Sequence, residues 1–178
     1  MNSYKKTTFL CRLIAALSCF ALIVTAICPI PAHAAATEAL SLKYNGKTVV
    51  VEAPDGSIAS YKKLKNVFGT AAKQYQKDGM NAYKCKASGC SLLLEPWWAD
   101  DTLNGYSVTI KITSKKAALN GIKVGMSYDS VQAKLEKKYG KSSVDAKDNE
   151  INLINVANSY IQYSFKNGKV KRIDFFHS

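Results

Sequence analysis

The strongest constraint on the fold is a set of Asn-Gly pairs whose flanks alternate between apolar and polar residues. Asn-Gly accepts the positive φ angles of a two-residue hairpin turn, and alternation is the period of a half-buried strand. Three segments have this pattern: 40–51 around Asn45-Gly46, 104–112 after Asn104-Gly105, and 161–175 around Asn167-Gly168. The sequence therefore predicts antiparallel strands arranged in three hairpins.

Two segments between these hairpins have the apolar spacing of helices. The spacing residues are Tyr61, Leu64, Val67 and Phe68 in the first, and Tyr128, Val131, Leu135 and Tyr139 in the second. Gly69 and Gly140 follow directly, and glycine is the usual residue just past a helix end. Ser57 or Ser60 is a candidate N-cap for the first helix, and Ser127 for the second.

The two predicted helices share the pattern Leu-x-x-x-aromatic-Gly, at 64–69 and 135–140, and strand-forming residues with an Asn-Gly turn follow each. This similarity indicates a weak internal repeat, with chance as the alternative. We therefore expect an α+β fold in which two helix-plus-antiparallel-sheet halves, at 40–114 and 115–178, form one compact domain at 35–178.

The N-terminus has the three-part order of a secretory signal peptide. Lys5, Lys6 and Arg12 precede an apolar run at 13–27, and Ala32-His33-Ala34 follows. Small residues at 32 and 34 predict a signal peptide at 1–34, cleaved between Ala34 and Ala35, and hence a periplasmic or extracellular protein. The alternatives are an uncleaved anchor, or a lipoprotein modified at Cys19 or Cys28.

The predicted mature chain is strongly basic. The full chain has 25 Lys and Arg against 13 Asp and Glu, and removing the three basic residues of the leader leaves 22 against 13, or about +9. Outside the cytoplasm this charge suits an acidic protein, an anionic envelope polymer or a lipid surface, and nucleic acid is not an expected partner. A solvated lysine-rich surface without a partner is the alternative.

Cys85 and Cys90 are the two cysteines that follow the predicted cleavage site. An even count in an exported chain indicates a disulfide, and Ser88-Gly89 between them supplies a bend. A redox pair is the alternative, although the spacing is longer than Cys-x-x-Cys. A zinc site lacks ligands, because His177 is the one histidine beyond the leader.

No residue pattern predicts a catalytic, metal or cofactor site. His177 stands one residue from the C-terminus, where a chain usually frays. Glu95, Asp100 and Asp101 could ligate calcium, but without regular oxygen spacing a polar loop is the alternative.

Trp97 and Trp98 are the candidate partner-binding residues. Adjacent residues in an extended segment point to opposite sides, so one tryptophan can enter the core while the other forms an outward anchor. In the alternative, both pack inside. Tyr160 and Tyr163 could widen such a surface.

The segment from Gly125-Met126-Ser127 through Val131 and Leu135 to Gly140 resembles a signature of small bacterial envelope proteins. They include the small lipoprotein of the outer-membrane barrel-assembly machinery and the group with the tandem helix-plus-sheet fold of the β-lactamase inhibitor protein. The resemblance covers about 55 C-terminal residues and implies that fold and a non-catalytic role in presenting a surface to another protein. The chain departs from the pattern at Lys141, where proline is frequent, and in lacking a well-placed lipidation cysteine.

These observations predict an exported, non-catalytic protein-binding or adaptor module of the bacterial cell envelope or extracellular space, with an unidentified protein partner and no cofactor. The alternatives are a secreted hydrolase inhibitor, a binder of anionic envelope surfaces, and an enzyme that uses carboxylates alone.

Overall fold

Each half of the described chain passes through the same series of elements: a two-stranded hairpin, a helix with a short 3-10 turn, and four consecutive strands. The first half comprises β1 (Leu40–Tyr44), β2 (Lys47–Glu52), α2 (Tyr61–Phe68), β3 (Ala72–Lys77), β4 (Met80–Ala87), β5 (Cys90–Ala99) and β6 (Thr102–Ile112). The second comprises β7 (Ala117–Leu119), β8 (Ile122–Lys123), α3 (Tyr128–Tyr139), β9 (Val144–Lys147), β10 (Glu150–Val156), β11 (Ser159–Lys166) and β12 (Lys169–His177). The 3-10 turns are Gly69–Ala71 after α2 and Lys141–Ser143 after α3. This computed structural model describes residues 39–156 and 159–177.

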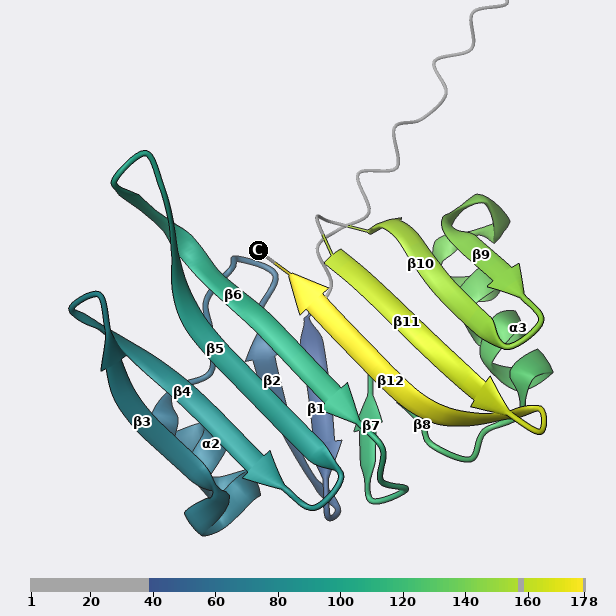
Figure 1. Cartoon of the computed structure of the whole chain (residues 1–178), viewed down its shortest axis with the longest axis horizontal. Helices are drawn as coiled ribbons and strands as arrows, with labels where there is room; N and C mark the ends of the chain where they lie inside the picture. Colours follow the sequence, from purple (N-terminus) through teal and green to yellow (C-terminus); the bar gives the residue numbers. More distant parts are fainter. Residues whose placement is uncertain (1–38, 157–158, 178) are drawn as a thin grey trace, which may run out of the picture. The chain divides into compact units, whose positions relative to one another are not determined.

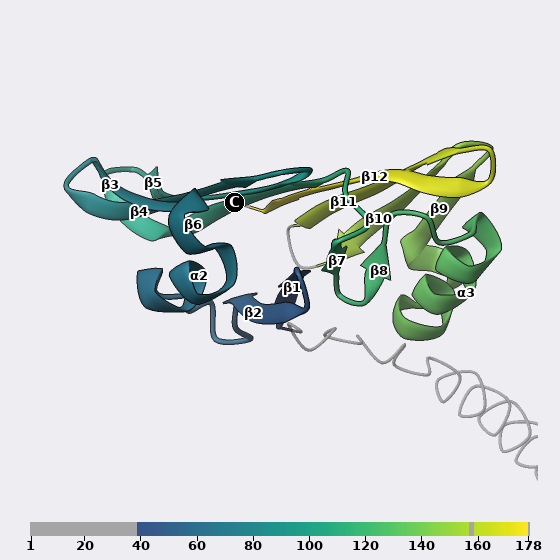
Figure 2. The same cartoon turned by 90° about the horizontal axis from the view of Figure 1, so that it is seen from below.

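The strands form two antiparallel sheets. The large sheet has the order β3-β4-β5-β6-β12-β11-β10-β9, and the small sheet has the order β2-β1-β7-β8. The halves therefore meet at β6 and β12 in the large sheet and at β1 and β7 in the small one (Figure 1). Viewed along the layers, the small sheet and both helices lie on the same side of the large sheet (Figure 2).

Two of the three predicted Asn-Gly turns are confirmed. Asn45-Gly46 connects β1 to β2 and Asn167-Gly168 connects β11 to β12, with positive φ at all four residues. The Asn104-Gly105 turn is wrong, because both residues lie inside β6 and the chain turns at Asp100-Asp101. Trp97 is opposite Gly105 while Trp98 is opposite Leu103. Asn104 is therefore an extra residue in β6, and the Asn104-Gly105 pair lies in a β-bulge.

Both predicted helices are confirmed, α2 at Tyr61–Phe68 and α3 at Tyr128–Tyr139. Ser60 and Ser127 occupy the N-cap positions in extended conformation, without a side-chain cap hydrogen bond. Gly69 and Gly140 follow at φ of 58° and 82°, values that glycine reaches without a Cβ clash.

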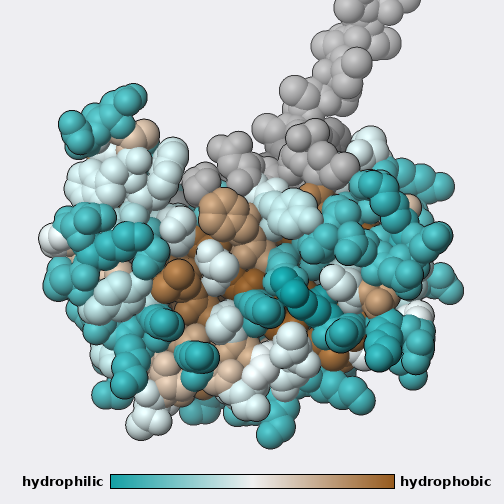
Figure 3. All heavy atoms as spheres, viewed as in Figure 1, coloured by the Kyte–Doolittle hydropathy of each residue, from teal (hydrophilic) through white to brown (hydrophobic). Residues whose placement is uncertain are grey.

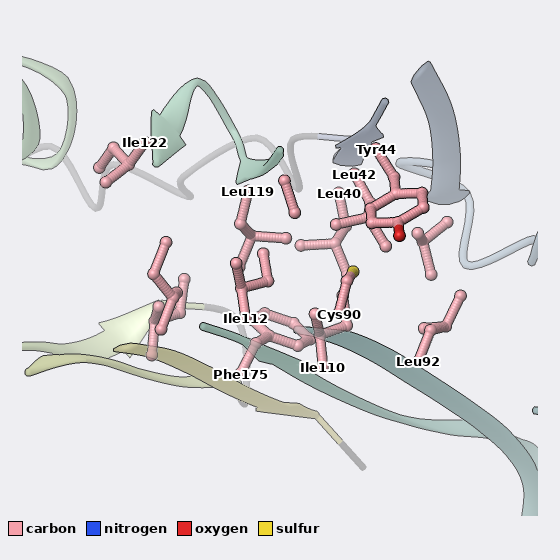
Figure 4. Packing of buried hydrophobic residues seen from close by; sticks show 14 of the residues in the cluster. Leu40, Leu42, Tyr44, Cys90, Leu92, Ile110, Ile112, Leu119, Ile122 and Phe175 are labelled. Atoms are coloured by element: carbon pink, nitrogen blue, oxygen red, sulfur yellow. The ribbon is translucent and has the colours of Figure 1, made fainter. Parts of the chain in front are cut away.

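The space between the sheets is filled by apolar side chains from both. Leu42, Tyr44 and Leu119 point from the small sheet toward Ile110 and Phe175 on the large one (Figure 4). Leu64 of α2, and Val131 and Leu135 of α3, belong to the same buried cluster. One core therefore joins the two halves.

The predicted α+β class is wrong, because the described chain is mostly β, with two sheets and two short helices. The Asn-Gly pattern identified too few turns: Asp78-Gly79 and Asp148-Asn149 join neighbouring strands as well, and Ser88-Gly89, expected as a bend between two cysteines, joins β4 to β5. Each unrecognised turn hides a strand pairing, so the sheet content was underestimated.

Candidate functional site

The candidate site is the face of the large sheet that is turned away from the small sheet. Figures 1 and 2 show no described element in front of this face. Strand side chains alternate between the two faces, so the residues between the core positions are directed to solvent here. Figure 3 shows hydrophobic residues gathered over the middle of this face, with hydrophilic residues on both sides.

A row of mainly apolar side chains, which we call the aromatic row, crosses the centre of the open face. Strand register places Leu93 opposite Thr109, Thr109 opposite Phe176, and Phe176 opposite Tyr160. Phe176 and Tyr160 are each 47% exposed although they lie within regular strands. The two exposed aromatic residues therefore occupy directly opposite positions at the junction of the halves, and the Tyr160 hydroxyl donates to Asn152 Oδ1 at 3.3 Å.

Part of this row was detectable in the sequence. Tyr160 was expected to contribute to a partner surface and is exposed, whereas Tyr163 is 1% exposed and belongs to the core. Phe176 was missed, although Phe175-Phe176 carries a signal. Two adjacent aromatics in a strand must face opposite sides, and Phe175 is the one that is buried.

The hairpin of β5 and β6 carries the second group of exposed apolar side chains. Trp97, Trp98 and Leu103 are 41%, 39% and 37% exposed. Neither tryptophan enters the core, which corrects the prediction that one of them does. The hairpin extends past the end of β12, since His177 is the last described partner and pairs with Val108. Beyond that point β6 has β5 alone as its described neighbour, and no inner layer covers the rings.

Glu95 is fixed on the open face by two hydrogen bonds. The Tyr75 hydroxyl donates to Oε1 at 2.6 Å, and the Lys77 ammonium donates to Oε2 at 2.7 Å. The bonds from Lys77 and Tyr75 lower the pKa of the Glu95 carboxyl below its ordinary value. Burial, together with the Glu95 carboxylate, raises the pKa of Tyr75 to about 12. Glu95 therefore connects β3 to β5. Because its carboxylate is bound by Lys77, Glu95 is not available as a calcium ligand, which argues against the calcium alternative.

Charge is unequally distributed on the open face. In the first half, Lys73 is opposite Lys84, and Lys84 is opposite Leu93. Ser91 lies between two further lysines, because it is opposite Lys86 on one side and opposite Lys111 on the other. These four lysines are exposed, and none of them forms an ion pair. In the second half Arg172 is paired with Asp174, and Lys147 with Asp145. The open face is thus basic on one side of its aromatic row.

His177 is directed away from the open face toward the small sheet, where its Nδ1 is 2.9 Å from Oε2 of Glu52. This contact links the end of β12 to the end of β2, and so joins the two sheets. Over 39–156 and 159–177, no three His, Cys, Asp or Glu residues gather closely enough to hold a metal ion.

Cys85 and Cys90 are both buried free thiols in this structure, and the disulfide between them stays a prediction. The turn places Cys85 opposite Leu92 and Cys90 opposite Ala87. The cysteines are therefore diagonal neighbours rather than directly opposite residues. Burial raises the pKa of both thiols to about 12, and for Cys85 the neighbouring Cys90 adds to the shift.

A small pocket lies between α3 and the small sheet. It measures about 180 Å³, and Ile122, Leu135, Tyr139 and Tyr163 contribute its apolar wall. Sites for drug-sized ligands are typically about 300–1,000 Å³, so this pocket can hold only a small group.

In the described ranges, no helix combines the length and apolarity required to span a bilayer. No family model, no curated protein and no solved structure matches this chain. The open face, with its aromatic row and its tryptophan hairpin, is therefore the feature from which a function must be argued.

Proposed function

We propose that this chain is an exported, non-catalytic module that binds a protein partner through the open face of its large sheet. The observation that carries the proposal is the set of exposed aromatic residues on this face and its hairpin, Phe176, Tyr160, Trp97 and Trp98. Rigid aromatic anchors are the residues that most often dominate protein interfaces. Their exposure is costly in water unless a partner covers them.

The expected partner is an acidic protein surface with an apolar centre. The aromatic row would fill that centre, and the unpaired lysines beside it would face carboxylates at the rim. Charge at a rim mainly accelerates association, while buried aromatics determine how long the complex lasts.

The test is capture from envelope and extracellular extracts on immobilised protein, read by quantitative mass spectrometry and followed by measurement of Kd. Trp97→Ala or Phe176→Ala should weaken binding at least tenfold, as expected for an anchor worth about 2 kcal/mol. Val50→Ala is the matched control, because Val50 is 41% exposed but lies on the small sheet. Equal capture by all three variants contradicts the proposal.

Inhibition of a hydrolase is the second candidate function, and the projecting hairpin favours it. Its tip residues Asp100 and Asp101 have φ of 49° and 59°, and it extends past the end of β12. An inhibitor of this kind inserts such a tip into an enzyme cleft. A panel of lactamases, proteases and lysozymes at micromolar protein tests it, and lack of inhibition across the panel removes it.

A further inference from the structure

The outward face of the small sheet carries a second, chemically different surface. Register places Lys43 of β1 opposite Ala118 of β7, and Ala118 opposite Lys123 of β8. Directly opposite residues share a face, so two lysines flank a position that holds only a methyl group. The small side chain between them leaves a hollow of about 430 Å³.

Two further lysines line the hollow. They are Lys115 and Lys116, which belong to the loop that precedes β7. The backbone of this loop is held in place: the Asn45 amide donates to the Lys116 carbonyl at 3.0 Å, and the Lys116 amide donates to Ser114 Oγ at 3.2 Å. Three separate segments of the chain therefore place four lysines around one hollow.

No carboxylate compensates this charge. None of the four lysines has an ion pair, and neither Asp nor Glu lines the hollow. The sequence from Thr102 to Tyr128 contains no acidic residue at all. Like charges held together repel, and a bound anion relieves that repulsion.

The chemistry of the hollow restricts the anion. Lysine ammonium groups bind phosphate as point charges without the fixed fork of arginine, so a flexible ligand can be accommodated. The exposed aromatic residues of the described chain lie on the large sheet and its hairpin, whereas Val50 is the large exposed apolar residue of the small sheet. The face thus lacks stacking platforms for nucleic-acid bases and aromatic anchors for a membrane.

We propose that this hollow binds a linear chain of phosphate groups, of the kind found in polyphosphates and phosphodiester polymers that carry no bases. Successive phosphates would lie along the row from Lys43 to Lys123, with Lys115 and Lys116 also lining the hollow. This site is separate from the proposed protein-binding face, because it lies on the other side of the small sheet from the core.

Binding of defined-length inorganic polyphosphate to the full chain, measured by calorimetry over a salt series, tests the proposal. The double variant Lys43→Gln/Lys123→Gln should weaken binding at least tenfold and reduce the slope of log affinity against log salt by about 1.5, as expected for two lost phosphate contacts. The matched control is Lys62→Gln/Lys63→Gln, which removes the same charge from exposed positions of α2 and should change affinity less than twofold.

Four outcomes would overturn the proposal: no binding of polyphosphate at low salt; equal weakening by both double variants, which indicates net charge alone; monomeric phosphate binding as tightly as the polymer; or binding to phosphatidylglycerol vesicles without binding to polyphosphate. Trp97→Ala should leave polyphosphate binding unchanged, and the double lysine variant should leave capture of the protein partner unchanged. The two proposals can therefore fail independently.

Discussion

The two halves of the molecule share an element order but differ in how the end of the helix is covered. In the first half Phe68 is 6% exposed and stacks on Tyr44 of β1, with ring centroids 5.3 Å apart. In the second half the corresponding Tyr139 is only half-buried and lines the 180 Å³ pocket. The β1–β2 strands have 5 and 6 residues, whereas β7 and β8 have 3 and 2. The helix end of the first half is thus covered by an aromatic ring of its hairpin, whereas that of the second half borders a pocket.

The halves also differ in what they present on the open face. The first half holds the tryptophan hairpin, the unpaired lysines and the cross-strand contact of Glu95. The ion pairs of the second half, Lys147–Asp145 and Arg172–Asp174, each lie within a single strand. We infer that the first half supplies most of the binding face, while Tyr160 and Phe176 extend it across the junction.

The largest expected effect concerns Cys85 and Cys90, which both lie in the first half. Burial raises the pKa of both thiols to about 12, so very little thiolate is present near pH 8, and burial also blocks access of the reagent. Alkylation followed by peptide mapping should show both thiols unreactive in the native full chain and fully reactive in denaturant.

The same experiment tests whether the halves open separately. Because one core joins them, labelling should require the full free energy of unfolding. Faster labelling would mean that the first half opens by itself. Peptides that remain unlabelled in denaturant without reductant would indicate a disulfide and contradict the free thiols.

The next largest expected effect is a difference in stability between variants truncated at the end of each helix, at Phe68 in the first half and at Tyr139 in the second. Phe68→Ala should destabilise the fold by about 4 kcal/mol, as for a buried aromatic, and Tyr139→Ala by about 1–2 kcal/mol, because Tyr139 borders an existing pocket. Leu64→Ala and Leu135→Ala are the controls; both leucines are buried, so each should cost about 3 kcal/mol. Urea unfolding measures all four, and equal losses at 68 and 139 would refute the difference in covering.

Glu95→Gln tests the contact that distinguishes the first half. The pKa of Glu95 is lowered in the folded state, so its carboxylate stabilises the fold above the ordinary value of 4.5, and this stabilisation is lost as the pH falls through the folded value. The variant should be less stable by about 1 kcal/mol at pH 7, a modest figure because Lys77 is partly exposed. The difference should shrink in denaturant titrations as the pH falls below 4.5. A double-mutant cycle with Lys77→Gln should show coupling between the two substitutions. Additive losses of stability would show that the Lys77–Glu95 ion pair does not stabilise the fold.

The smallest expected effect is at the tip of the tryptophan hairpin. Asp101 adopts a φ of 59°, which glycine reaches with less strain. Asp101→Gly should therefore raise the melting temperature slightly, because the relieved strain of about 1–2 kcal/mol exceeds the cost of about 0.4–1 kcal/mol that glycine adds through the entropy of the unfolded chain. Gly79→Ala, in the β3–β4 turn at φ of 77°, is the reciprocal control and should destabilise. A loss of stability in Asp101→Gly would indicate that the aspartate side chain supports the turn.

Local patterns predicted individual elements better than their assembly. Both helices, with their capping positions, and two of the Asn-Gly hairpins follow from spacing and turn chemistry within about ten residues. The pair at 104–105 failed because Asn-Gly accommodates a bulge as readily as a turn, and the partner strand decides which forms. The fold class failed for the same reason, since turns without Asn-Gly join most of the strands.

The candidate site was predictable only in part. Trp97 and Trp98 were identified from their chemistry, but their exposure depends on where β12 ends. The diagonal offset of Cys85 and Cys90 likewise depends on the register of β4 and β5.

The sequence by itself determined the local geometry: where the chain turns, where it is helical, and which strand residues alternate. Tertiary structure alone decided which face stays uncovered, and it alone placed Lys43 and Lys123, eighty positions apart in sequence, on the two sides of Ala118. The physical reason is that hydrogen-bonded register between distant strands, and the layer that covers them, are set by packing of the whole core. No short segment contains that information.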